Sequence, residues 1–371
     1  MKILIGGGGT GGHVFPAIAI AQAIKKACPD ADILFVGAQD KIEMEKVPAA
    51  GFKIIGLPAA GLQRKLTLKN LVLPFKLLKC ARMSKKIIKD FQPDIAVGVG
   101  GYASGPILRA ASKAGIPIML QEQNSHAGLT NKMLADKAVK IFTAYKNMEK
   151  YFDPAKTMLT GNPVRADIAE NNSTREEALQ HFNLSPDKKT VLIIGGSLGA
   201  GTINKAVLKY AEKFQAEGNI QLIWQTGKYY WNDIEAAMKT KNCPDIHATA
   251  FVKRMDLAYK AADVVVSRSG ALSVSELCLA AKPVIFIPSP NVAEDHQTKN
   301  AMALVNENAA GIIKDSDAEQ VFFEKIQNLC NDNETMQLFS KNIYKLAVKN
   351  SADIIASEVI NYANNKKNKQ L

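Results

Sequence analysis

The chain opens with Lys2-Ile3-Leu4-Ile5-Gly6-Gly7-Gly8-Gly9-Thr10-Gly11-Gly12-His13 and repeats the same pattern near its middle with Val191-Leu192-Ile193-Ile194-Gly195-Gly196-Ser197-Leu198-Gly199-Ala200. In each stretch a short apolar run breaks into glycines and then into residues that favour a helix. A buried parallel strand turns in this way into a helix whose first N–H groups can bind an anion. Two such turns predict two nucleotide-type domains that face one cleft.

Length and composition agree with two domains. The chain has 371 residues, of which 47% are hydrophobic, enough for two packed cores. Its five cysteines lie far apart without a Cys-x-x-Cys pair, which argues against a zinc site or a disulfide framework and favours a reducing cytosol. The first residues read as a strand rather than a signal sequence, and no uncharged apolar run reaches about 18 residues. We therefore expect no membrane-spanning segment.

The formal net charge of +12 is locally concentrated, because the segment from Leu62 to Lys89 carries many cations and no acidic residue. If Pro74 opens a helix, the helical period sorts this segment into two faces. The face expected to pack on the domain holds Leu77, Cys80, Ala81, Ser84, Ile87 and Ile88. The outer face holds Phe75, Leu78, Lys79, Arg82, Lys85, Lys86 and Lys89. This mixture of apolar and cationic groups is typical of a helix lying on an anionic membrane, with an ordinary solvated lysine face as the alternative.

Apolar runs alternate with helical stretches through both halves, which predicts two doubly wound, mainly parallel α/β sheets. The further expected strands are Ile33–Val36, Lys53–Gly56, Ile95–Val99, Pro117–Leu120, Val139–Phe142, Ile220–Gln225, His247–Val252, Val264–Ser267, Val284–Ile287 and Gly311–Ile313, with only a short run at Thr157–Leu159 before the break. Glycine and proline near Gly161 interrupt the pattern, which places the domains at 1–162 and 163–345. Residues 346–371 are expected to form an amphipathic helix and a frayed polar tail from Asn364.

The first glycine loop also satisfies Gly-x-Gly-x-x-Gly at Gly7, Gly9 and Gly12. A dehydrogenase would require an acid at the end of the next strand, where only Asp40 is near, so an NAD site is disfavoured. His13 falls in the first turn of the following helix. The helix dipole there favours a neutral imidazole that can accept a proton, which makes His13 a candidate general base. A histidine that merely caps or packs is the alternative.

A third strand-turn-helix pattern runs from Asp263 through Ser269-Gly270 into a helix. Its serines and N–H groups suit a diphosphate, and Glu276 could hydrogen-bond a ribose. The Ser273-x-x-Glu276 spacing fits a plain capping box equally well.

Two Asp-x-Asp sequences could suggest a metal site for a diphosphate, but neither is well placed. Asp30-Ala31-Asp32 precedes its strand and so lies at the amino end of the sheet, away from the ligand edge. Asp315-Ser316-Asp317 follows a strand but is more simply the start of a helix. We therefore expect no metal and no cofactor, with helix N-termini and arginine stabilising the leaving diphosphate.

The order of seven motifs resembles the MurG family, the bacterial glycosyltransferases of family 28 that add N-acetylglucosamine to the undecaprenyl-diphosphate-linked muramyl-pentapeptide of peptidoglycan synthesis. The resemblance spans Met1 to about Gly311 and rests on Gly8-Gly9-Thr10-Gly11-Gly12-His13-Val14-Phe15-Pro16-Ala17, Gly100-Gly101-Tyr102-Ala103-Ser104-Gly105-Pro106, Gln121-Glu122-Gln123-Asn124, Gly161-Asn162-Pro163-Val164-Arg165, Gly195-Gly196-Ser197-Leu198-Gly199-Ala200, Arg268-Ser269-Gly270-Ala271-Leu272-Ser273-Val274-Ser275-Glu276 and Asp295-His296-Gln297 followed by Asn300-Ala301.

The resemblance implies a GT-B fold and a metal-independent, inverting hexosyltransferase that converts lipid I to lipid II. UDP-N-acetylglucosamine would be the donor and the lipid-linked muramyl 4-hydroxyl the acceptor, with His13 as the base. The implied donor contacts are Thr10, Gly11, Gly12, Asn124, Arg165, Ser197, Val252, Ala271, Leu272, Ser273, Val274, Ser275, Glu276 and Gln297. Tyr102, Ser104 and His126 are candidates for contacts with the acceptor or its loops.

The same resemblance implies a peripheral protein on the cytoplasmic face of the plasma membrane. Its terminal helix would return to the first domain, and its partners would be an anionic membrane surface and other cell-wall synthesis proteins. Two rival functions share the architecture, a nonhydrolysing UDP-N-acetylglucosamine epimerase and another GT-B glycolipid transferase. A nucleic-acid-binding module would explain the charge but not the paired glycine turns, so no nucleic acid is expected.

Overall fold

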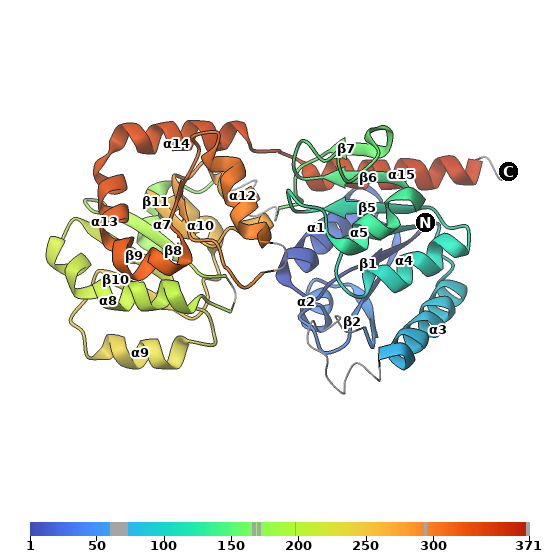
Figure 1. Cartoon of the computed structure of the whole chain (residues 1–371), viewed down its shortest axis with the longest axis horizontal. Helices are drawn as coiled ribbons and strands as arrows, with labels where there is room; N and C mark the ends of the chain where they lie inside the picture. The colour runs from blue at the N-terminus through green and yellow to red at the C-terminus, as the bar shows by residue number, and fades with distance from the viewer. Residues whose placement is uncertain (60–72, 165–167, 169–171, 197, 293–294, 369–371) are drawn as a thin grey trace. The chain divides into compact units, whose positions relative to one another are not determined.

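A computed structural model describes residues 1–59, 73–164, 168, 172–196, 198–292 and 295–368. The chain divides into two compact units, Met1–Arg165 with Val348–Leu371 and Ala166–Ala347 (Figure 1). The sequence analysis placed the corresponding limits after residues 162 and 345. Each unit is a parallel sheet with helices on both faces.

The sheet of the first unit runs in the order β3-β2-β1-β4-β5-β6-β7, with every pair parallel. Ile3 and Ile5 of β1 pack with α1 and α15 on one face, whereas Leu4 packs with α3 and α4 on the other. This alternation follows from the two-residue period of a strand. The elements are β1 (Lys2–Gly6), α1 (Gly11–Ala27), β2 (Asp32–Ala38), α2 (Glu43–Ala49), β3 (Lys53–Leu57), α3 (Leu73–Phe91), β4 (Ile95–Gly98), α4 (Ser104–Lys113), β5 (Ile118–Glu122), α5 (Leu129–Leu134), β6 (Ala138–Thr143), β7 (Thr157–Leu159) and α15 (Ser351–Asn368).

The sheet of the second unit runs in the order β10-β9-β8-β11-β12-β13 and is also parallel throughout. Its core centres on the buried rings of Trp224, Phe214 and Phe322. The elements are α7 (Arg175–His181), β8 (Lys189–Ile194), α8 (Gly201–Glu217), β9 (Ile220–Gln225), α9 (Trp231–Lys239), β10 (Ile246–Thr249), α10 (Met255–Ala261), β11 (Val264–Ser267), α11 (Ala271–Ala280), β12 (Val284–Phe286), α12 (His296–Val305), β13 (Gly311–Ile312), α13 (Ala318–Asn331) and α14 (Asn333–Lys345). Every strand expected from the sequence is present in the two sheets.

The terminal helix α15 packs against α1 of the first unit, where Ile355 and Val359 are fully buried. Lys140 on β6 pairs with Glu358, and Ser351 donates a hydrogen bond to the carbonyl of Thr160. The prediction of a frayed tail from Asn364 is wrong, because α15 continues to Asn368. Ala363, one residue earlier, is buried against the sheet and continues the packed side of the helix.

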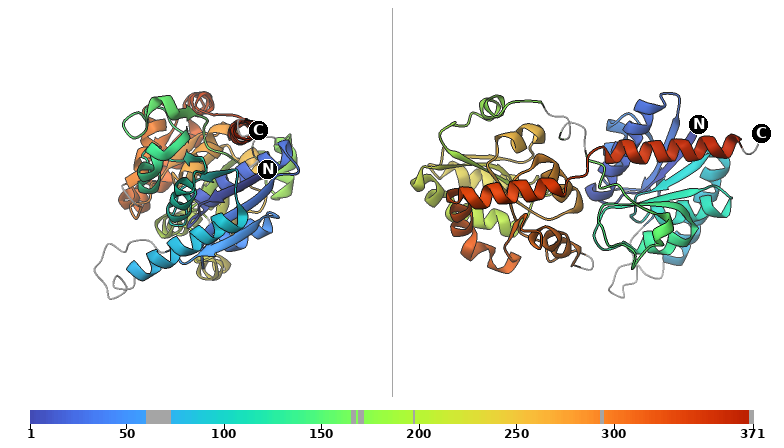
Figure 2. Two further views of the ribbon diagram at one scale, coloured as in Figure 1. Left: turned by 90° about the vertical axis from the view of Figure 1, so that its right-hand side faces the viewer. Right: turned by 90° about the horizontal axis from the view of Figure 1, so that it is seen from above.

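The two predicted faces of α3 are partly correct. Cys80, Ser84, Ile87 and Ile88 are buried, as expected for the packed face. Leu77 is 54% exposed, and Ala81 is exposed as well, so both were assigned to the wrong environment. Leu77 lies in the first turns of the helix, which reach out from the body of the unit (Figure 2), whereas Ala81 lies beside the buried Cys80 at the edge of the packed face. Periodicity identifies a face but not where along the helix the packing begins.

Candidate functional site

The ligand edge of the first unit lies at the switch point between β1 and β4, where the strand order reverses. The loops that follow β1, β4 and β5 meet there. A Cβ on Gly101 would lie 2.0 Å from the carbonyl oxygen of Gly8, and Gly101 has a φ of +86°. Gln123 donates a hydrogen bond of 2.8 Å to the carbonyl of Val99. Only glycine allows the first two loops to approach this closely.

His13 lies in the first turn of α1 at this edge. Its Nδ1 is 3.1 Å from the hydroxyl of Thr10, the residue that caps the helix. On the other side, a Cβ on Gly100 would lie 3.0 Å from Nε2 of the ring. The ring is half-buried, held by Thr10 and bordered by the loop after β4. This geometry orients an imidazole at the place where a doubly wound sheet binds its ligand.

Two buried carboxylates hold these loops, and the sequence analysis gave neither of them a role. Glu43 on α2 accepts hydrogen bonds from the N–H groups of Gly9 and Ala38. Glu122 at the end of β5 accepts from Asn124, Gly128 and Asn131. Burial raises the pKa of Glu122, and these N–H donors oppose that shift by stabilising the charged form. No local pattern marks such residues, since their partners are supplied by the fold.

The predicted acceptor residues differ in their accessibility. Tyr102 is 55% exposed and lies beside Gly9, as expected for a residue that meets a ligand. His126 is half-buried, and its Nδ1 lies 2.5 Å from the hydroxyl of Tyr151. Ser104 is fully buried at the start of α4, where its hydroxyl lies beside Gly98. That position favours a packing role for Ser104 over a contact with substrate.

The second unit has its own cavity of about 730 Å³ at the switch point between β8 and β11. The glycine turn after β8 and the first turn of α8 form one wall, and the loops after β11 and β12 form the other. Its lining residues are Gly195, Gly196, Gly199, Ala200, Gly201, Thr202, Lys205, Tyr229, Tyr230, Arg268, Gly270, Ser273, Ser289, Asn291, Gln297 and Asp315. The N-termini of α8 and α11 together with Lys205 and Arg268 make this cavity suitable for a phosphorylated ligand.

Three of the predicted donor residues that do not belong to α11 have defined positions. Gln297 accepts a hydrogen bond from the N–H of Ser289 and borders the cavity. Val252 is buried, and its N–H donates to the side chain of Gln225. Asn124 in the first unit is held by Glu122. Arg165 and Ser197 lie outside the described residues, and the donor contacts of all the residues named from the sequence stay predictions.

The first turns of α11 carry the remaining predicted donor residues, Ala271, Leu272, Ser273, Val274, Ser275 and Glu276. Ser273 borders the cavity, whereas Val274 is buried against the core. The capping-box alternative for Ser273 and Glu276 is wrong, because the helix begins at Ala271 after Gly270 and no side chain caps it. Glu276 instead accepts a hydrogen bond from the hydroxyl of Tyr259. This contact orients the Glu276 carboxylate and is compatible with a ribose ligand.

Arg268 forms a clamp that the sequence analysis did not anticipate. Its Nη1 donates to the carbonyls of Ile287 and Pro288 and to Asp315, at 2.8, 3.0 and 2.5 Å. Asp315 in turn accepts from the hydroxyl of Thr202 at 3.0 Å. The clamp joins the loops after β11, β12 and β13 to the start of α8. It therefore fixes the shape of the cavity.

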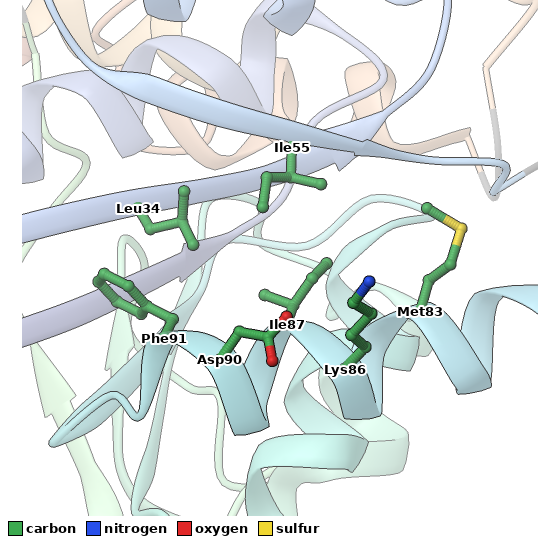
Figure 3. A pocket seen from close by; sticks show the side chains of 7 residues that line it. All are labelled: Leu34, Ile55, Met83, Lys86, Ile87, Asp90 and Phe91. Atoms are coloured by element: carbon green, nitrogen blue, oxygen red, sulfur yellow. The ribbon is translucent and has the colours of Figure 1, made fainter.

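The cationic face predicted on α3 is exposed at Leu78, Lys79, Arg82, Lys85, Lys86 and Lys89. The side chain of Phe75 lies outside the described part of the structure. Lys86 and Asp90 also border a cavity of about 410 Å³, otherwise lined by Leu34, Ile55, Met83, Ile87 and Phe91 (Figure 3). Lys86 is exposed overall, and its side chain extends beside this apolar lining.

None of the helices within the described ranges combines the length and apolar character needed to cross a bilayer. Within the same ranges, His, Cys, Asp and Glu form no group of three suited to a metal ion. The predictions that the protein uses no metal and no cofactor remain to be tested.

Two doubly wound units, each with a glycine turn at its switch point, define the GT-B class of fold. The chain matches the model of the Glycosyltransferase family 28 N-terminal domain over residues 3–143 and that of the C-terminal domain over residues 190–356. The chain belongs to glycosyltransferase family 28. The family indicated by the seven sequence motifs is thereby confirmed.

Curated relatives match along nearly the whole chain. Proteins of Parabacteroides distasonis and Phocaeicola vulgatus, both named UDP-N-acetylglucosamine–N-acetylmuramyl-(pentapeptide) pyrophosphoryl-undecaprenol N-acetylglucosamine transferase, are each 54% identical. The first match covers 97% of both chains, and the second covers 98% of this chain and 96% of the relative.

Solved structures share the fold. The crystal structure of MurG from Acinetobacter baumannii is 25% identical with a TM-score of 0.76, covering 97% of this chain and 99% of that chain. The UDP-GlcNAc 2-epimerase from Neisseria meningitidis has a TM-score of 0.67 at 14% identity, covering 97% of this chain and 100% of that chain. The second likeness concerns the fold alone.

Proposed function

We propose that this chain transfers N-acetylglucosamine from UDP-N-acetylglucosamine to the undecaprenyl-diphosphate-linked muramyl-pentapeptide, converting lipid I to lipid II in peptidoglycan synthesis. The observation that carries the proposal is identity of 54% across nearly the whole length to transferases named for this reaction. Two features of the structure fit this reaction. A cavity suited to a nucleotide diphosphate lies in the second unit, and an oriented histidine lies at the ligand edge of the first.

The chemistry proposed for this site is a single inverting displacement. His13 removes the proton from the muramyl 4-hydroxyl, and that oxygen attacks the anomeric carbon of the donor as UDP leaves. The bond from the anomeric carbon to the diphosphate breaks as the new glycosidic bond forms, so α becomes β. The helix N-termini around the cavity, with Lys205 and the predicted Arg165, stabilise the negative charge on the departing diphosphate.

The lipid acceptor explains the exposed cationic face of α3. This face carries lysine and arginine together with Leu78, which is 49% accessible, and Leu77 in the same turn of the helix is 54% accessible. Anionic lipid attracts such cations, and the leucines gain from entering the boundary of the acyl chains. We infer a peripheral protein bound at the cytoplasmic face of the plasma membrane, where other cell-wall synthesis proteins are candidate partners.

The assignment is tested by measuring UDP release with and without a lipid I analogue, together with analysis of the sugar products. We expect UDP release to require the analogue and a β-linked N-acetylglucosamine to appear on it. An epimerase would instead convert the donor sugar without any acceptor. Conversion of that kind, with no transfer to the analogue, would refute the proposed function.

Activity is expected to survive removal of divalent metals. Lys205 and the N-termini of α8 and α11 border the cavity, and with the predicted Arg165 they can replace a metal as the source of positive charge for a diphosphate. The initial rate after exhaustive treatment with EDTA should therefore stay close to that of the untreated protein. Complete loss of activity that magnesium or manganese restores would reveal a metal requirement.

A further inference from the structure

We propose that Glu43 is a positioning residue for the transfer reaction, because its carboxylate fixes the glycine loop from which Thr10 and His13 extend. The proposal rests on the role assigned above to His13. Glu43 begins α2, is 1% exposed, and lies 30 positions along the chain from the histidine that it would support. It does not border either of the cavities described above.

The carboxylate ties two strand ends together. Its Oε2 accepts the N–H of Gly9 at 2.9 Å, and its Oε1 accepts the N–H of Ala38 at 2.8 Å. Gly9 belongs to the loop after β1, and Ala38 is the last residue of the neighbouring β2. One oxygen satisfies the buried N–H of Ala38, and the other holds the partly buried N–H of Gly9.

The surrounding glycines are shaped to this carboxylate. A Cβ on Gly8, which has a φ of +142°, would lie 2.1 Å from Oε1 of Glu43. A Cβ on Gly37 would lie 2.5 Å from its Cγ. Gly8 and Gly37 therefore leave the space that the buried Glu43 carboxylate fills. This carboxylate in turn fixes the path of the loop from Gly8 to Thr10.

This arrangement gives the two glycine turns of the chain different tasks. The Gly9 N–H is occupied by a carboxylate of the protein itself, which also disfavours an anionic ligand at that point. The N–H groups predicted to bind an anion are those of the first turn of α1, which begins at Gly11, so Gly9 is not one of them. The turn after β8 borders the open cavity of the second unit. The first turn instead sets the position of Thr10, whose hydroxyl contacts Nδ1 of His13.

The decisive variant is Glu43→Gln, which keeps the size of the side chain but places an NH₂ group against one of the two N–H donors. The loop from Gly8 to Thr10 must then shift, and His13, the proposed base, shifts with it. We expect kcat to fall at least about tenfold, since small misplacements of a reacting group are costly. The KM for UDP-N-acetylglucosamine should change by a smaller factor than kcat, because most of the predicted donor contacts lie in the second unit and only Thr10, Gly11 and Gly12 follow the loop that Glu43 holds. Should this variant fail to fold, Glu43→Asp provides the same comparison with the charge retained.

Three comparisons distinguish a positioning role of Glu43 from a general loss of folded structure. Glu45→Gln on the same helix is the matched control, because the Glu45 side chain is 72% exposed and pairs with Lys46. In a His13→Ala background, Glu43→Gln should cost little further activity, since both changes disable the same step. The NMR resonances of the His13 ring, measured without substrate, should shift in Glu43→Gln and not in Glu45→Gln.

A folded Glu43→Gln protein with parental kcat would overturn the proposal. So would unshifted His13 resonances, or a full additional loss of activity in the His13→Ala background. The resonance measurement requires no reaction. A parent protein that makes no lipid II would therefore refute the proposed function while leaving the link between Glu43 and His13 open to its own test.

Discussion

His13→Ala is expected to lower turnover on the lipid acceptor by roughly 100-fold or more, as loss of a general base usually does. The reason is the position of the ring in the first turn of α1, with Nδ1 held by Thr10 at the ligand edge of the sheet. The affinity for UDP-N-acetylglucosamine should change little. Steady-state kinetics with both substrates varied will separate the two effects.

His181→Ala is the matched control for this experiment, because His181 is exposed at the end of α7 in the second unit. It should leave turnover unchanged. Near-parental turnover of His13→Ala would contradict the assignment of the base. The search would then move to other polar groups around the first glycine loop, beginning with Tyr102, which is exposed beside Gly9.

Reversing three cations of α3 together, by Lys79→Glu, Arg82→Glu and Lys86→Glu, is expected to weaken binding to anionic vesicles by at least about 100-fold. Each cation near such a surface contributes about 1 kcal/mol, so loss of three removes roughly 3 kcal/mol before any repulsion from the new carboxylates. All three side chains are exposed, so the fold should survive. Vesicle sedimentation at low and moderate salt measures the effect.

Turnover provides a second measurement for the same triple variant. A short-chain, water-soluble acceptor should be used at close to the parental rate, whereas a long-chain acceptor in vesicles should be used far more slowly. Lys213→Glu, Lys341→Glu and Lys345→Glu form a control of equal charge change at exposed positions of the second unit. Equal sedimentation of the α3 variant and the parent would show that this helix is a solvated lysine face and that docking occurs elsewhere.

The local patterns of the sequence determined the elements and their class. Alternation of apolar runs with helical stretches gave the strands of the two sheets other than the three-residue β7, because the period of a buried strand is a property of neighbouring residues. The glycine runs marked the two switch points, since a sharp strand-to-helix turn with close backbone contacts requires that residue. The order of the motifs was sufficient to indicate the family.

The tertiary structure alone decided which side chains support the site. Glu43 meets Gly9 across 34 positions and Gln123 meets Val99 across 24 because parallel strands bring distant segments to one sheet edge. No spacing along the chain encodes these pairs. The same holds for Asp315, interpreted from sequence as the start of a helix, which binds Arg268 across 47 positions.

The errors in the sequence analysis have the same origin. The Ser273 and Glu276 spacing fits a capping box, but the packing of α10 beside α11 gives Glu276 a partner in Tyr259. The helical period placed Leu77 on the packed side, but Leu77 is 54% exposed in the first turns of α3. Hydrogen-bond partners and burial depend on what the fold brings alongside a residue. Local sequence determined the strands, turns and family of this protein, and the long-range contacts determined how its site is held.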